Sequence, residues 1–303
     1  MNNRSWRTAA AMLFAAATLT AQTPTSVPIV LRVPAGTRYL GLGNTGVSGR
    51  DDEVLFYNPA LLAVVRGTTI SAQRYWPGNT SGAFSTALAF AGGGLGIGGQ
   101  YLGYSTDALT LPIATGSLDS SGTRSASSAA ATVGFARVFK GIRWGIATKF
   151  VGESAPLDRS TSGFFDLGAQ KDFRYLGVGL AVQNVGMFGV SDVLEPSRVT
   201  IGAMSEQALV NFVPVSPYLD AALAAQVSVL NDGWVKPAGG LELGVNWIQG
   251  YFITLRAGGR RPEADERPFT AGATLAADRF RFDYALETRE SGNLSHRVGV
   301  RIR

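Results

Sequence analysis

The sequence predicts an all-β fold, a transmembrane antiparallel β-barrel of about fourteen strands with a short N-terminal plug that contains a small helix. Three observations predict this class. Segments of alternating hydrophobicity recur from residue 67 to Arg303, the connections between them alternate between short and long, and an export leader precedes them. The expected organisation is a signal peptide over residues 1–21, a plug over residues 22–66 and a barrel over residues 67–303.

The alternation is clearest in residues 280–287, where four apolar side chains (Phe280, Phe282, Tyr284, Leu286) alternate with Arg281, Asp283, Ala285 and Glu287. Successive side chains on a strand point to opposite faces, so one face is apolar and the other charged. In a membrane barrel the apolar face meets lipid and the charged face lines the lumen. A secreted β-sandwich with a packed core is the alternative, because soluble sheets also alternate. The recurrence of ionised residues opposite the apolar face favours the barrel.

The same periodicity places the strands along the whole C-terminal part of the chain. They are expected at residues 68–76, 82–91, 95–104, 125–139, 142–153, 161–173, 176–185, 198–205, 217–229, 239–247, 251–257, 268–276, 279–288 and 296–303.

The connections alternate in length. Short turns are expected at residues 92–94, 140–141, 172–175, 248–250 and 277–278, and long polar connections at 105–124, 154–160, 186–196, 230–236, 258–267 and 289–295. Outer-membrane barrels have short periplasmic turns, long extracellular loops and an even number of strands. Only residues 206–215 form a longer connection on the short side. Aromatic residues near strand ends are expected at the two lipid–water boundaries: Tyr75, Trp76, Tyr101, Tyr104, Trp144, Tyr175, Trp247 and Tyr251.

The N-terminus predicts export to the cell outer membrane. Arg4 and Arg7 precede an apolar run over residues 8–19, and Thr20-Ala21 forms a small-residue cleavage site. The run is short for an uncleaved membrane anchor. The chain has no cysteine, which excludes disulfides and a lipoprotein anchor. A dispersed net charge of +5 does not indicate a nucleic-acid partner.

The segment before the first strand is glycine-rich, then acidic, and ends in Asn58-Pro59-Ala60. Asn58 is a favoured N-cap and Pro59 suits the first helical turn, so a helix is expected from Pro59 to about Val64. So short a helix is unstable alone and must pack on the barrel lumen. The Asp51-Asp52-Glu53 run is expected to be a solvated or helix-capping patch, with a cation site as the alternative.

Polar side chains on the inner parity of the strands have mixed signs, which indicates internal ion pairs and hydrogen bonds to the plug rather than an ion filter. The expected lumen-facing residues are Arg143, Lys149, Asp166, Gln183, Glu242, Arg256, Arg281 and Asp283. No catalytic constellation is recognisable. His296 is the only histidine, so neither a metal site nor a Ser-His-Asp triad is expected, and the protein is predicted to be non-enzymatic without a cofactor.

Several motifs resemble one family. The segment from Gly36 to Ala60 has a Gly-x-x-x-Leu-Gly-x-Gly-x-x-x-Val pattern over residues 36–47, an acidic pair and Tyr57-Asn58-Pro59-Ala60. Later pieces are residues 165–168, 180–186, 255–258, 282–285 and 296–298. Together they resemble the PorV/PorQ family, relatives of the FadL-type fatty-acid channels. The resemblance implies a fourteen-stranded barrel with an N-terminal hatch.

The resemblance also implies a function. A PorV/PorQ-type barrel would assist type IX secretion or surface attachment of cargo proteins, with residues 105–124 and 258–267 as candidate contact loops. The alternative is a FadL-like channel for fatty acids or other hydrophobic small molecules, in which the hatch around Asn58-Pro59-Ala60 moves to admit ligand. A purely structural barrel is a third hypothesis, because a fold does not imply a function. The expected partners are outer-membrane lipid and either cargo proteins or a hydrophobic small molecule.

Overall fold

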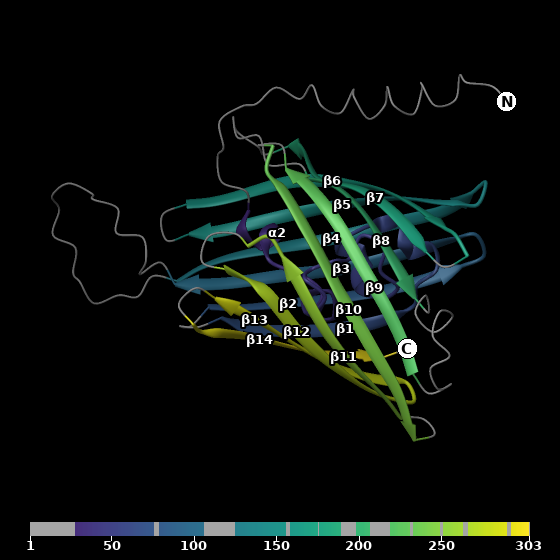
Figure 1. Ribbon diagram of the computed structural model, residues 1–303. Helices are drawn as coiled ribbons and strands as arrows, with labels where there is room; N and C mark the ends of the chain where they lie inside the picture. Colours follow the sequence, from purple (N-terminus) through teal and green to yellow (C-terminus); the bar gives the residue numbers. More distant parts are fainter. Residues whose placement is uncertain are drawn as a thin grey trace, which may run out of the picture.

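The structure is a closed antiparallel β-barrel with residues 28–66 inside it (Figure 1). The computed structural model describes residues 28–75, 79–105, 125–155, 158–174, 176–188, 198–206, 219–230, 233–248, 251–262, 266–289 and 292–302. Within these ranges fourteen strands each pair with their neighbours in the chain, and β1 pairs with β14 to close the ring. We call the β1–β14 junction the seam.

The strands are β1 (Gly67–Tyr75), β2 (Asn79–Phe90), β3 (Gly93–Ser105), β4 (Ser125–Phe139), β5 (Ile142–Ala155), β6 (Asp158–Asp172), β7 (Gly177–Phe188), β8 (Arg198–Glu206), β9 (Leu219–Leu230), β10 (Val235–Ile248), β11 (Tyr251–Arg260), β12 (Glu266–Ala277), β13 (Phe280–Arg289) and β14 (Leu294–Ile302).

The predicted fold class and strand number are confirmed, and the β-sandwich alternative is wrong because all strands close into one ring. Several strands run further into the long connections than predicted: β10 begins at Val235 and β11 ends at Arg260. Hydrophobic alternation fades there, but backbone hydrogen bonds between neighbouring strands do not need apolar side chains. We call the end of the barrel with the long connections the loop end, and the opposite end the turn end.

Side chains alternate between the two faces of the wall, except where a register shift interrupts a strand pair. On β14 the exposed positions include Val298, Val300 and Ile302, whereas Arg297 and Arg301 are buried inside the barrel. The same outward apolar pattern recurs around the ring, for example at Leu255 on β11, which is 61% exposed. A wall that is apolar outside and polar inside is the arrangement of a transmembrane barrel. Separately, none of the helices in the described ranges is long and apolar enough to cross a membrane.

The aromatic residues follow the expected pattern only in part. Tyr101, Trp144 and Tyr251 are about half exposed on the outer face. The expectation is wrong for Tyr75, which shares the inward parity of β1 and is 5% exposed. Its ring lies under the Arg289 guanidinium, 4.9 Å from the centroid. The side chains of Trp76, Tyr104, Tyr175 and Trp247 lie outside the described part.

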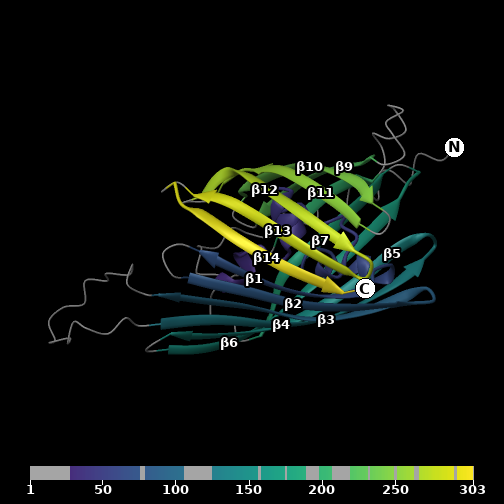
Figure 2. The same cartoon turned by 90° about the horizontal axis from the view of Figure 1, so that it is seen from below.

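The plug lies inside the ring of strands, as the purple ribbon in Figure 2 shows. It contains two short α-helices, α2 (Ile29–Arg32) and α3 (Thr37–Gly41), and two 3-10 helices, η2 (Asp52–Phe56) and η3 (Pro59–Ala63). The expected N-cap is present, because Asn58 Oδ1 accepts a hydrogen bond from the Ala60 backbone N–H at 3.1 Å. The predicted signal peptide lies outside the described residues.

The two 3-10 helices fit closely against β3 because the inner face of this strand has glycines where they approach it. On β3, Gly94, Gly96 and Gly98 face η2 and η3. A methyl group on Gly94 would overlap the Leu62 carbonyl oxygen, and one on Gly98 would lie 2.8 Å from the Phe56 ring. The glycine-rich run of β3 is therefore the contact surface for the two 3-10 helices.

Replacing Val298 by arginine should destabilise the folded barrel by about 2–4 kcal/mol, because the charge would face hydrocarbon at mid-depth. Val298 lies in the middle of β14, where it pairs with Ala72 and Tyr284. Leu294→Arg is the matched control: it lies on the same face at the loop end of β14 and should cost about 0–1 kcal/mol. Guanidinium unfolding in lipid vesicles measures the free energy of unfolding of both variants. Equal losses of stability in the two variants would contradict a lipid-facing outer wall.

Candidate functional site: the plug and the wall around it

The first part of the plug is attached to the seam by one buried arginine. Arg297 on β14 is 1% exposed and donates hydrogen bonds to the backbone carbonyls of Pro34 (2.6 Å) and Ala35. The same guanidinium donates to Gln73 Oε1 at 3.1 Å and Ser71 Oγ at 2.8 Å, both on β1. Because one side chain joins β14, β1 and the plug, the seam and the plug are ordered together.

The acidic run of the plug is attached to the same seam at the turn end. Asp52 Oδ1 accepts from Arg301 Nε (2.7 Å) and Thr69 Oγ1 (2.9 Å), and Asp52 Oδ2 accepts from Ser85 Oγ at 2.7 Å. Asp51 lies 3.3 Å from Arg301 Nη2. Both carboxylates are essentially unexposed. The expectation of a solvated or capping patch is therefore wrong, because arginines of the barrel wall neutralise the run inside the lumen.

A second ion network joins the plug to β10, β11 and β13. Arg38 on α3 donates through Nε and Nη2 to both oxygens of Glu242 on β10, at 3.0 and 2.9 Å. Arg256 on β11 also donates to Glu242 and lies 3.4 Å from Asp283 on β13. Of the predicted lumen residues, Glu242, Arg256 and Asp283 are thus brought together. Arg38, which links them to the plug, was not anticipated from the sequence.

Three further predicted residues lie beside β7. Lys149 Nζ is 2.7 Å from Asp166 Oδ2 and donates to Asn184 Oδ1 at 2.8 Å. Asn184 has a φ of 57° and its N–H donates to Asp166 Oδ1, at a register shift between β6 and β7. The neighbouring Gln183 donates from Nε2 to the Phe56 carbonyl of the plug at 2.8 Å. The Lys149–Asp166 ion pair therefore binds both the side chain and the backbone N–H of Asn184 at the register shift.

Burial also changes the protonation of the plug. Burial raises the pKa of Glu53 to about 8, against the opposing effect of Arg297, and the Thr37 N–H donates to Glu53 Oε1 at 3.0 Å. Burial likewise raises the pKa of Tyr57 to about 12. Glu53 is therefore mostly neutral at pH 7, and the plug adds less negative charge to the lumen than its sequence indicates.

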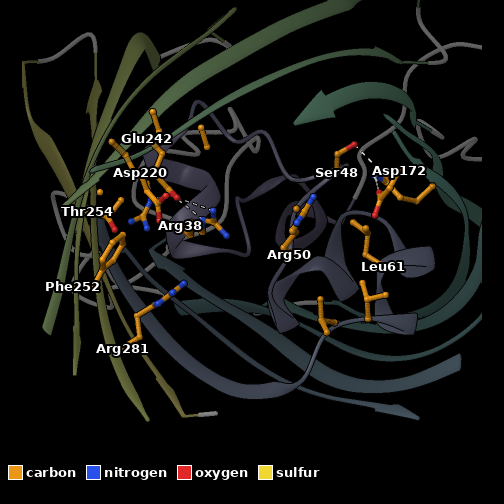
Figure 3. A pocket seen from close by; sticks show the side chains of 18 of the residues that line it. Arg38, Ser48, Arg50, Leu61, Asp172, Asp220, Glu242, Phe252, Thr254 and Arg281 are labelled. Carbon is orange, nitrogen blue, oxygen red and sulfur yellow. Dashed lines mark hydrogen bonds and ion pairs between the residues drawn. The ribbon is translucent and has the colours of Figure 1, made fainter. Parts of the chain in front are cut away.

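A polar cavity of about 410 Å³ lies between the plug and the wall towards the turn end. Figure 3 shows Arg38 and Glu242 on one side of this cavity, Ser48 and Asp172 on the other, and Arg50 between them. The predicted lumen residues Arg143 and Arg281 also line the cavity, and Arg143 pairs with Asp172. The open part of the lumen is therefore charged and poorly suited to an apolar molecule.

A second cavity, of about 400 Å³, lies on the outer face of β4–β7, and we call it the outer pocket. Its walls are mostly apolar side chains, with Arg137 at one side, and two glycines, Gly145 and Gly168, form part of its lining. The apolar residues are Phe135, Trp144, Ile146, Leu167, Ala169, Leu180 and Val182, and the five larger ones other than Val182 are each more than a third exposed.

Behind these glycines lies the Asn58-Pro59-Ala60 turn. A methyl group on Gly145 would overlap the Ala60 nitrogen, and one on Gly168 would overlap Asn58 Oδ1. Asn58 is fully buried, and its Nδ2 donates to the Val47 carbonyl (2.8 Å) and to the Ala169 carbonyl of β6 (3.2 Å). At this point only the backbone of the wall separates the outer pocket from the plug.

The sequence does not reveal this glycine pair by itself. Gly145 and Gly168 are register partners on β5 and β6, so they are neighbours only once the strand pairing is known. The usable signal was two glycines on the inward parity of adjacent strands. His296 lies on the outer face, with the Tyr284 hydroxyl 2.6 Å from its Nδ1. Within the described ranges no cluster of His, Cys, Asp or Glu could hold a metal ion.

No protein-family model and no curated protein matches the sequence. Among solved structures, the chain is similar to the toluene transporter TbuX of Ralstonia pickettii, with a TM-score of 0.58 and 12% identity over 90% of this chain and 100% of TbuX. The similarity to the Pseudomonas putida toluene transporter TodX has a TM-score of 0.58 and 9% identity, and covers 89% of this chain and 97% of TodX. The similarity to a Pseudomonas aeruginosa FadL homologue has a TM-score of 0.56 and 9% identity, and covers 89% of this chain and 98% of the homologue. These likenesses establish a shared fold.

Adding one methyl group at Gly145 should displace the turn and destabilise the protein by about 1–3 kcal/mol through overpacking. Gly152→Ala on the same strand is the control, because a methyl group there meets nothing within 4 Å. Guanidinium unfolding in vesicles compares the two variants. If Gly145→Ala were as stable as Gly152→Ala, the turn would not lie against the wall as described.

Proposed function

We propose that this protein is an outer-membrane channel for hydrophobic small molecules, in which the Asn58-Pro59-Ala60 turn controls an exit through the wall between β5 and β6. The observation that carries the proposal is the alignment of the turn, the glycine pair and the outer pocket. The similar structures support it, since they include proteins named as toluene transporters and a monoaromatic hydrocarbon channel.

The polar cavity favours a lateral exit over a straight one. An apolar molecule passing along the lumen to the turn end would have to enter a cavity lined by Arg38, Arg50, Arg143, Asp172 and Glu242. Desolvating such groups without replacing their hydrogen bonds is costly. An opening at Gly145 and Gly168 would instead release the molecule into the outer pocket, whose lining is almost wholly apolar.

Movement at this point requires few bonds to break. Asn58 makes the direct tie from the turn to β6, through Nδ2 and the Ala169 carbonyl. The ion pairs of the plug lie elsewhere, at the seam and at Glu242. Further hydrogen bonds join Phe56 to Gln183 on β7 and Ser48 to Gln170 on β6, on the plug segments before the turn. The turn can therefore move while the rest of the plug stays attached.

The secretion role stays a prediction. Its first candidate contact loop, residues 105–124, lies almost entirely outside the described part, as do residues 263–265 of the second.

Cells that express the protein should take up radiolabelled toluene faster than cells with an empty vector. Asn58→Ala removes both amide donors and the N-cap, so the uptake rate should change by at least about threefold, given about 1 kcal/mol for a lost cap. Gly152→Ala should leave uptake unchanged. Equal uptake with and without the protein would overturn the transport proposal, and unaltered uptake by Asn58→Ala would overturn the role of the turn.

A further inference from the structure

A third cavity lies at the loop end of the lumen, and we call it the loop-end cavity. Its volume is about 40 Å³, and five cationic side chains line it: Arg32, Arg198, Lys236, Arg260 and Arg261. No carboxylate lines it among the described residues. Its other polar side chains are neutral, namely Asn44, Gln226 and Ser228. This concentration of one sign contrasts with the mixed charges of the polar cavity at the turn end.

Arg198 provides the second observation. It is the first residue of β8 and points inward, with Gln183 and Leu230 as its register partners. Its Nε is fully buried and has no hydrogen-bond partner in the described chain. Of the charged side chains that act on its guanidinium, Asp166 attracts it and Arg32 repels it. A buried N–H of a cation without an acceptor is unfavourable, so the site is incomplete without an anion.

The neighbouring cations are held in place around this gap. Arg261 donates from Nη1 to the Val235 carbonyl at 3.1 Å, and its guanidinium lies 5.2 Å from the centroid of the Trp234 ring. Lys236 lies 4.9 Å from the same ring. Arg260 donates to Glu287 at 2.7 Å. Trp234 therefore holds two cationic side chains beside the cavity.

The geometry points to a binding site for a phosphate-class oxyanion in the loop-end cavity, with Arg198 as its central ligand. Guanidinium groups bind phosphate through paired N–H donors, which a tetrahedral dianion accepts from several directions at once. Several converging cations favour a dianion over a carboxylate, because each additional charge adds Coulomb attraction. The site does not depend on hydrophobic transport.

Two sources could supply this group at the loop end. One is free inorganic phosphate and the other is the phosphate of a surface glycolipid such as lipopolysaccharide. Two of the residues that line the site stand next to long connections: β8 begins at Arg198 and β11 ends at Arg260. The cavity is thus reached from the end of the barrel that faces away from the polar cavity.

Equilibrium dialysis of the purified full-length protein against radiolabelled inorganic phosphate tests the site, with lipopolysaccharide and dephosphorylated lipopolysaccharide as parallel probes. We expect saturable binding that Arg198→Gln weakens by about tenfold or more, the equivalent of about 1.4 kcal/mol. Arg261→Gln should weaken it in the same direction. Arg279→Gln, an exposed arginine at the turn end, is the charge-matched control and should bind normally.

Each outcome of these binding measurements either identifies the source of the bound phosphate group or overturns the proposed site. Binding of inorganic phosphate identifies the free anion, and binding of lipopolysaccharide but not of its dephosphorylated form identifies the glycolipid. Failure of all probes to bind the unaltered protein would overturn the proposal. Equal weakening by Arg279→Gln, or displacement by acetate as effective as by phosphate, would also overturn it. The heat-dependent gel mobility of each variant verifies that the barrel is folded.

Discussion

The close approach of the plug backbone to the barrel wall is the constraint on which the rest of the structure depends. A ring of fourteen strands encloses a lumen that side chains from the wall do not fill. The chain fills it with its own N-terminal segment, and at Gly94, Gly145 and Gly168 even a methyl group would overlap the plug. Glycine weakens a strand interior, so its use here is explained by the contact that it permits. At Gly145 and Gly168 the wall has no side chain on its inner face, so only its backbone separates the plug from the outer pocket.

Charged side chains buried between the plug and the wall need oppositely charged or hydrogen-bonding partners, and these come from both the plug and the wall. Asp52 and Arg38 of the plug form ion pairs with Arg301 and Glu242 of the wall. Arg297 of the wall donates hydrogen bonds to backbone carbonyls of the plug. Breaking one partner of such a buried pair leaves an uncompensated charge, which is strongly unfavourable. The ion pairs therefore hold the plug at the seam and at β10. The Asn58 turn, which is held to β6 by a neutral hydrogen bond, is the more easily displaced contact. This distribution of strong and weak contacts is what makes a local opening physically reasonable.

Much of the barrel could be predicted because its signals are local. A period of two identifies a strand and also its two faces, so the number of strands and the inward parity of Lys149 or Glu242 follow from short segments. The Asn58 cap is equally local. Contacts between distant segments could not be predicted. The burial of Asp51 and Asp52 depends on Arg301, about 250 residues away, and the Gly145–Gly168 pair depends on the β5–β6 register. Tyr75 shows that the parity of a residue within its strand predicts its face better than its closeness to the strand end does.

The most direct test of the account asks whether the plug occupies the lumen against the seam. Thr37 Cβ lies 3.3 Å from where a Cβ on Gly299 would stand, close to the spacing of about 3.5–4.5 Å in disulfides. The chain has no cysteine, so a Thr37→Cys/Gly299→Cys variant reports one pair alone. The account predicts an intramolecular disulfide, seen as a reductant-sensitive shift on a denaturing gel, whereas Thr37→Cys/Gly152→Cys should not cross-link because Gly152 is exposed on the outer wall. Two thiols that stay free and reactive to maleimide after oxidation would contradict a plug docked inside the barrel.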